Sequence, residues 1–135
     1  MQAGFYEWHT IGKKKYPYYT SLKEQPFFSM GCLYENCVNR ETGEMKSTFS
    51  IITVAANPMM EKIHNSKKRM PFILPAEKEK LLIEKELPKE KIQQLMIPFV
   101  EDKMQAHTIS KLITDRTRNS NVEEVMEKQA YPELA

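Results

Sequence analysis

The first half of the chain is a series of short aromatic and threonine-containing runs, and this pattern constrains the fold more than any other feature. Runs of this composition are typical of β-strands when turn residues bound them. The predicted strands cover residues 4–8, 16–22, 26–34 and 48–55. Gly12 and a lysine run separate the first two, so we expect these two to pair as a hairpin. A polar loop is predicted over residues 36–46.

The second half is predicted to be mainly helical. Asn57 followed by Pro58 is typical of an N-cap with proline in the first turn, which predicts a short helix over residues 58–63. Further helices are predicted at 75–86, 88–96 and 121–128, and strands at 70–74 and 108–113. Antiparallel strands followed by helices indicate an α+β architecture, and the 135 residues are expected to form a single domain, 1–135.

Charge and cysteine content narrow the function classes. The net charge of +2 neither demands nor excludes nucleic acid as a partner, so the placement of basic residues has to decide. Cys32 and Cys37 lack the second ligand pair of a zinc site, so no metal and no cofactor is predicted. The apolar runs are too short to span a bilayer, and we expect a soluble, cytoplasmic protein (nucleoid-associated in a bacterium) without a membrane partner.

The first predicted strand starts almost at Met1, with no element before it to pair with it or cover it. A sheet built only from the residues that follow keeps an exposed aromatic edge, which natural proteins usually avoid. We therefore expect that a segment N-terminal to Met1 belongs to the same domain.

Two motifs, in a fixed order, carry a family resemblance. The first is GFYEW at residues 4–8, followed by the lysine-rich turn and by YPYY at 16–19. The second runs from FSIIT at 49–53 through AAN at 55–57 to IHN at 63–65 and RMPFIL at 69–74. Together they resemble the SOS-response-associated peptidase family. The similarity extends over essentially the whole chain, but only over the later half to two-thirds of the family's domain.

The resemblance implies a curved antiparallel sheet or barrel-like core with short flanking helices. It also implies abasic-site processing in single-stranded DNA. Family members expose a cysteine as residue one after they remove their own initiator methionine. The α-amine of this cysteine attacks the ring-opened aldehyde of an abasic site, and its thiol closes a thiazolidine. The expected partner is therefore single-stranded DNA that carries abasic sites.

Two residues match the acid/base groups of the family. Glu7 corresponds to the catalytic glutamate, which moves a proton during imine formation and helps in methionine removal. His64 corresponds to the histidine that donates a proton to the opening sugar or contacts phosphate.

Five residues are candidates for DNA contacts. Trp8 follows the glutamate as in the family, where the aromatic side chain packs against unstacked DNA, and Thr53 falls on a DNA-contacting threonine. Arg69 matches the basic residue before Met-Pro. The spacing between histidine and arginine is longer here than in the family, so Lys67, Lys68 and Arg69 remain alternatives for the phosphate contact.

The chain departs from the family at the nucleophile. Position two is Gln2, and no residue matches the cysteine or the asparagine of the family's N-terminal part. Because methionine aminopeptidases prefer a small second residue, Met1 is expected to stay on. The resemblance thus implies a peptidase and crosslinking enzyme, whereas the chain as written lacks the attacking group. The alternatives are a non-covalent single-stranded DNA-binding module or a non-functional truncated remnant. The oligomeric state is left open.

Overall fold

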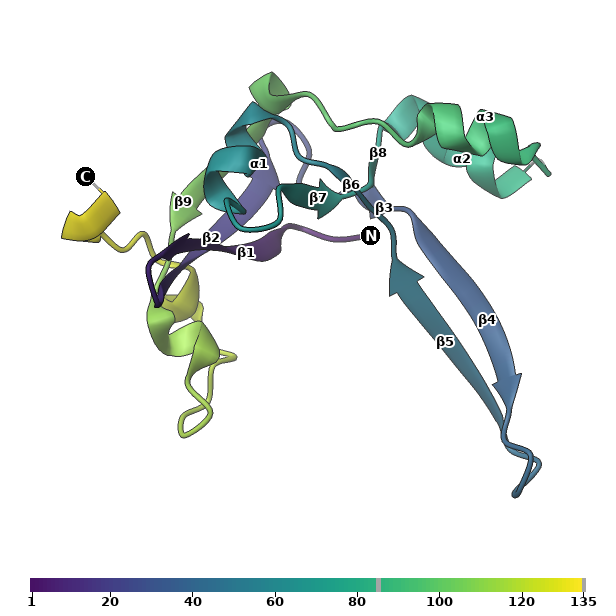
Figure 1. Ribbon diagram of the computed structural model, residues 1–135, viewed down its shortest axis with the longest axis horizontal. Helices are drawn as coiled ribbons and strands as arrows, with labels where there is room; N and C mark the ends of the chain where they lie inside the picture. The colour runs from purple at the N-terminus through teal and green to yellow at the C-terminus, as the bar shows by residue number, and fades with distance from the viewer. Residues whose placement is uncertain (85, 135) are drawn as a thin grey trace.

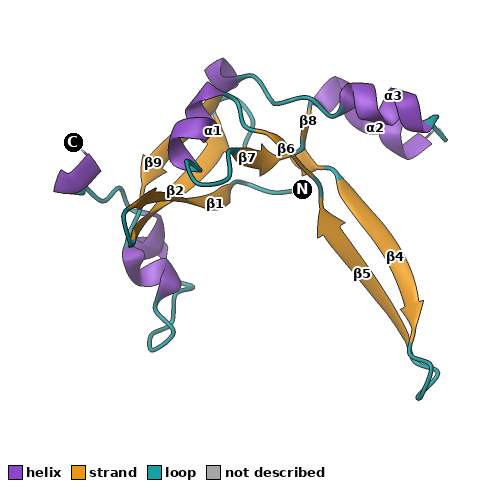
Figure 2. Ribbon diagram, in the orientation of Figure 1, coloured by secondary structure: helices purple, strands orange, loops and turns teal. Residues whose placement is uncertain are grey.

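A computed structural model describes residues 1–84 and 86–134. The strands occupy the centre, the helix pair α2 and α3 lies to one side, and a long two-stranded arm projects away from the rest (Figure 1). Strands and helices are both present and every strand pair is antiparallel, which confirms the α+β class (Figure 2).

The largest sheet has three strands. β1 (Phe5–Ile11) pairs with β2 (Lys14–Leu22), and β2 pairs with β9 (Met104–Thr108). The expected hairpin is confirmed, and its turn places Gly12 at φ +58°, a backbone conformation that glycine adopts without steric cost. The buried face of this sheet presents Tyr16, Thr20 and Met104 to the interior.

The remaining strands form two-stranded ribbons. β3 (Ser29–Met30) pairs with β8 (Ile73–Leu74), β4 (Cys32–Val38) with β5 (Met45–Ile51), and β6 (Thr53–Ala55) with β7 (Arg69–Pro71). Within residues 1–84 and 86–134 the sheets do not join into a closed barrel, so of the two forms that the resemblance implied, the curved antiparallel sheet is confirmed. A barrel requires every strand edge to be paired, and in the described part of the chain the outer edges of β1, β4 and β5 have no strand beside them.

Three residues, one from each of three chain segments, bond to one another and split three predicted strands. The Gly31 N–H donates to Phe72 O, the Phe72 N–H to Ile52 O, and the Ile52 N–H to Gly31 O, each at 2.9 Å. Each of the three chain segments thus changes partner at this ring of hydrogen bonds. A Cβ on Gly31 would overlap the Phe72 ring, so only glycine fits there. The predicted strands 26–34, 48–55 and 70–74 therefore break at Gly31, Ile52 and Phe72, respectively.

The arm is longer than the sequence indicated. β4 continues to Val38 and β5 begins at Met45, so the connecting loop covers 39–44 and not 36–46. The polar residues Asn36 and Ser47 face each other across the ribbon, with a 2.8 Å hydrogen bond from Ser47 Oγ to Asn36 Oδ1. Polar residues in this ribbon are compatible with strand geometry because both of its faces are exposed.

The helices largely match their prediction. α1 (Pro58–Ile63) is confirmed, with Asn57 as N-cap and Pro58 in the first turn. α2 (Ala76–Glu84) and α3 (Lys89–Leu95) correspond to the two expected charged helices. Lys85, near the predicted end of the first of these, lies outside the described residues, as does Ala135 at the end of the predicted domain.

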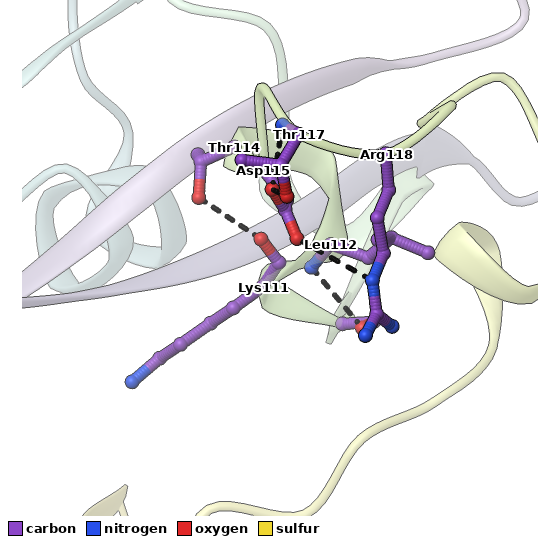
Figure 3. Close-up of polar contacts among 7 residues, drawn as sticks. Lys111, Leu112, Thr114, Asp115, Thr117 and Arg118 are labelled. Atoms are coloured by element: carbon purple, nitrogen blue, oxygen red, sulfur yellow. Dashed lines mark hydrogen bonds and ion pairs between the residues drawn. The ribbon is translucent and has the colours of Figure 1, made fainter.

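The C-terminal segment differs from the prediction. The strand expected at 108–113 lies at Met104–Thr108, because the Ser110 side chain accepts a hydrogen bond from Leu112 N at 3.2 Å and caps a 3-10 helix over Lys111–Thr114. Asp115 then closes the segment by accepting hydrogen bonds from the hydroxyl and the N–H of Thr117, which lower the Asp115 pKa (Figure 3). The helix expected at 121–128 is a 3-10 helix of Glu123–Met126.

The core lies where the short strands and α1 meet, under the three-stranded sheet. Its buried side chains include Leu22, Phe28, Val54, Met60, Ile63, Met70, Phe72, Ile73, Leu74, Phe99 and Met104. None of the helices in the described part of the chain has the length and apolar character needed to cross a bilayer. Residues 1–84 and 86–134 contain no group of three or more His, Cys, Asp or Glu side chains placed to hold a metal ion.

Candidate acid–base site

The structure brings Glu7 and His64 together, although they are far apart in sequence. Glu7 is the third residue of β1, and His64 is the C-cap of α1, which packs against that strand. The Glu7 Oε2 atom lies 3.4 Å from His64 Nδ1, and the side chains are 18% and 16% exposed, respectively. The predicted acid/base pair is therefore in direct contact, and it is largely shielded from solvent but still accessible.

The surroundings of the imidazole fix its tautomer. His64 Nδ1 lies 3.0 Å from the carbonyl oxygen of Arg69 as well as 3.4 Å from the Glu7 carboxylate. Both neighbours are acceptors only, so Nδ1 carries the proton. In the neutral ring, Nε2 is then the nitrogen that can take up a proton from a reacting group. Glu7 is itself held by the Trp8 N–H, which donates to Oε1 at 3.1 Å.

Two side chains that the sequence analysis did not single out hold α1 against β1. Asn65 accepts a hydrogen bond from Thr10 N at 3.0 Å and donates one to Thr10 O at 2.8 Å, as a paired strand would. On the same side of β1, His9 Nδ1 lies 2.6 Å from Lys62 O. Asn65 directly follows His64 in the IHN motif, and this adjacency was the available signal.

Replacement of Asn65 tests this positioning role. Asn65→Ala removes both hydrogen bonds to Thr10, and we expect a loss of about 1–2 kcal/mol in the free energy of unfolding, measured by urea denaturation. Asn119→Ala is the matched control, since the Asn119 side chain accepts a single local hydrogen bond in an exposed loop. Equal losses in the two variants would contradict the role assigned to Asn65.

Trp8 is not part of the Glu7–His64 contact. Side chains alternate along β1, and Glu7 pairs with Tyr18 whereas Trp8 pairs with Pro17. Trp8 therefore lies on the opposite face of the strand from Glu7, where it is half-buried. Tyr18 shares the face of Glu7, and burial raises the pKa of its hydroxyl above the ordinary value. Stacking of DNA on Trp8 stays a prediction. It requires the single-stranded DNA to pass around the edge of β1, from the face of Glu7 to the face of Trp8.

The other predicted DNA-contacting residues lie on the β6–β7 ribbon and in the turn that joins α1 to β7. Thr53 and Arg69 share the exposed face of the β6–β7 ribbon, because Thr53 pairs with Pro71 and Ala55 with Arg69. The Lys68 Nζ atom lies 3.8 Å from Glu61 Oε2, and Lys68 has a positive φ of 50° in the tight turn after α1. Lys67 and Arg69 are exposed and make no ion pair with any described residue. These two are therefore better available for a phosphate than Lys68.

A carboxylate, an imidazole with a fixed tautomer and nearby exposed cations can move protons at a substrate that carries phosphates. The sequence pattern of the family described as "SOS response associated peptidase (SRAP)" matches residues 1–116 of this chain. The chain belongs to the SRAP family. Its Glu7–His64 contact joins the two motifs on which the resemblance was based.

Two curated SRAP relatives come from Bacillus subtilis. The abasic site processing protein YoqW is 37% identical over 118 residues, which cover 86% of this chain and 51% of YoqW. The abasic site processing protein YobE is 36% identical over 111 residues, which cover 81% of this chain and 49% of YobE. The chain thus spans about half the length of the curated relatives it matches.

A solved structure extends the comparison to three dimensions. A crystal structure of a protein from Bacteroides thetaiotaomicron superposes with a TM-score of 0.88 at 35% identity, over 95% of this chain and 54% of the other. A protein from Bordetella bronchiseptica shares the fold at a TM-score of 0.71 and 20% identity, over 80% of this chain and 52% of the other.

Proposed function

We propose that this chain carries the acid–base and DNA-contacting part of an abasic-site processing domain that acts on single-stranded DNA. The observation that supports this most strongly is the 3.4 Å contact between Glu7 and His64, at the junction of the two family motifs. The names of YoqW and YobE supply the substrate class, because both are abasic site processing proteins.

The proposed chemistry is proton transfer at the aldehyde of a ring-opened abasic site. An amine adds to the C1′ aldehyde carbon to give a carbinolamine, which loses its hydroxyl as water to form an imine. A thiol then adds to the imine carbon and closes a thiazolidine, so that aldehyde, amine and thiol yield the ring and one water molecule. The Glu7–His64 pair protonates the departing hydroxyl and accepts the proton released by the amine, steps in which positioned acids and bases are effective.

Free cysteine provides a test, because it supplies both the amine and the thiol that Gln2 at position two does not. The rate of thiazolidine formation is measured on a single-stranded oligonucleotide with one abasic site, with free cysteine, in the presence and absence of the chain. We expect the chain to raise this rate by about 100-fold, the lower range for general acid–base catalysis. An identical rate with and without the chain would contradict the proposal.

Non-covalent binding of single-stranded DNA is the second candidate function. It is favoured by the exposed cations Lys67 and Arg69, which lie beside His64 and make no ion pair with any described residue. Contacts of this kind position the DNA without reading its sequence.

The paired substitution Lys67→Ala/Arg69→Ala tests the phosphate contacts. We expect an affinity for single-stranded DNA about tenfold lower, and a slope of log affinity against log salt that is shallower by about 1.4, since each lost contact to a single strand contributes about 0.7. Fluorescence anisotropy over a salt series measures both quantities. Lys89→Ala/Lys91→Ala on α3 is the control, and an equal effect there would mean that binding follows net charge alone.

A further inference from the structure

The arm formed by β4 and β5 is amphipathic, although all of its residues are exposed. Residues that face each other across the ribbon share a side, and successive residues alternate between sides. The side that we call the apolar face carries Cys32, Tyr34, Asn36, Val38, Met45, Ser47, Phe49 and Ile51. The opposite side carries Leu33, Glu35, Cys37, Lys46, Thr48 and Ser50.

The apolar face is built like the inner side of a sheet. Tyr34 is 67% exposed, Phe49 71% and Met45 67%, so large apolar side chains face solvent along the whole arm. The polar groups in the middle of this face bond to one another: Tyr34 OH and Ser47 Oγ donate to Asn36 Oδ1 at 2.6 and 2.8 Å. Apolar and polar residues alternate along most of the arm, with Leu33, Asn36 and Ser47 as exceptions. Such alternation is typical of strands that bury one side, and contiguous exposed apolar patches mark interaction sites.

We propose that the apolar face of the β4–β5 arm binds a further polypeptide, with the chemistry of the half of the SRAP domain that this chain does not match. Only 51% of YoqW and 54% of the Bacteroides thetaiotaomicron protein correspond to this chain, whereas 95% of this chain, the arm included, corresponds to the latter. The relatives therefore combine an equivalent scaffold with about as much additional polypeptide. This inference rests on family membership and not on the proposed DNA chemistry.

Charge and backbone both favour a polypeptide over other occupants. The apolar face carries no Lys, Arg, Asp or Glu, and nucleic-acid binding depends on cations that contact phosphates. Within residues 1–84 and 86–134, β4 and β5 pair only with each other, so the outer edge of each offers free backbone donors and acceptors. An added strand satisfies these groups, whereas neither nucleic acid nor lipid does so in register.

The two cysteines of the arm report which side is covered. Cys32 lies on the apolar face and Cys37 on the opposite side, and both thiols are exposed. A bound polypeptide on the apolar face therefore shields Cys32 and leaves Cys37 reactive. Labelling of Cys37 therefore serves as the internal control for labelling of Cys32.

The experiment uses the whole chain and overlapping peptides of about 15 residues, long enough to hold a complete strand, that cover the YoqW sequence outside the 118 matched residues. Binding is measured by anisotropy, and thiol labelling of Cys32 and Cys37 by mass spectrometry. We expect at least one peptide to bind and to slow labelling of Cys32 about tenfold, with the rate of Cys37 unchanged. Free backbone edges and an apolar strand face are sufficient for this mode of recognition.

Two neighbouring substitutions complete the test. Phe49→Asp places a carboxylate on the apolar face and is expected to weaken peptide binding about 30-fold, because the charge would be buried by the bound strand. Ser50→Asp places the same carboxylate on the opposite side and is expected to change binding less than threefold.

No peptide binding to the wild-type chain, or equal effects of the two substitutions, would overturn the proposal. So would protection of Cys32 that rises with chain concentration alone, which indicates a second copy, or protection by a DNA oligonucleotide. Abasic-site chemistry is measured separately, so its failure is distinguishable from the failure of this inference.

Discussion

Glu7→Gln is expected to abolish about 99% of the rate enhancement that the chain gives to thiazolidine formation at an abasic site, a 100-fold loss typical for removal of a positioned acid or base. Glutamine keeps the size of the side chain and can still accept the hydrogen bond from Trp8 N. It cannot carry a proton between the amine and the departing hydroxyl, and it presents no charge to His64. The loss therefore falls on the chemistry and not on the fold.

Two comparisons make the Glu7→Gln result interpretable. The free energy of unfolding should change little, which urea denaturation checks. Glu35→Gln is the matched control, because Glu35 is an exposed carboxylate on β4 with no contact to His64. If Glu7→Gln kept the rate of the wild-type chain, Glu7 would be an ordinary strand residue and the site would have to lie elsewhere.

Asn57→Ala is expected to lower the free energy of unfolding by about 2–4 kcal/mol, because it combines loss of a helix cap with two buried acceptors left without their donor. The side chain is 5% exposed. Its Oδ1 accepts from Met60 N at 2.9 Å, and its Nδ2 donates to Phe99 O at 2.7 Å and to Met104 Sδ at 3.2 Å. Asn57 thus fixes the start of α1 and ties it to the segment that leads into β9.

The control for Asn57 is an asparagine with similar local bonds but no burial. Asn39 accepts hydrogen bonds from the N–H groups of Glu41 and Thr42 in the exposed loop of the arm. Asn39→Ala should cost less than about 1 kcal/mol, since water replaces what is lost. A cost for Asn57→Ala no larger than that for Asn39→Ala would mean that α1, and with it His64, is held by other contacts.

Local sequence signals predicted the parts of the fold that depend on neighbouring residues. The β1–β2 hairpin follows from two aromatic runs around Gly12, and α1 from the Asn57-Pro58 pair. Local signals did not reveal the ring of hydrogen bonds that joins Gly31, Ile52 and Phe72, since it joins three distant segments. The three strands that it splits were accordingly predicted as continuous.

The candidate site, too, depends on contacts between distant residues that local sequence signals do not reveal. Glu7 and His64 were predicted only through the family resemblance, because a glutamate among aromatic residues and a histidine at a helix end carry no local signal of catalysis. Asn65 was missed, since its role is a pair of hydrogen bonds to Thr10, 55 residues away. Alternation along β1 placed Trp8 on the face opposite Glu7, a consequence of strand geometry that adjacency in the GFYEW motif conceals.

The central claim is that Glu7 and His64 act as one acid–base unit, and a double-mutant cycle tests it most directly. The rate enhancement of thiazolidine formation with free cysteine, after subtraction of the rate without the chain, is compared for the wild-type chain, Glu7→Gln, His64→Ala and the double variant. Residues that act as a unit are strongly non-additive, so we expect the double variant to keep at least about half of the enhancement of the slower single variant. Losses that multiply would instead show that the two residues act independently and would contradict the paired site.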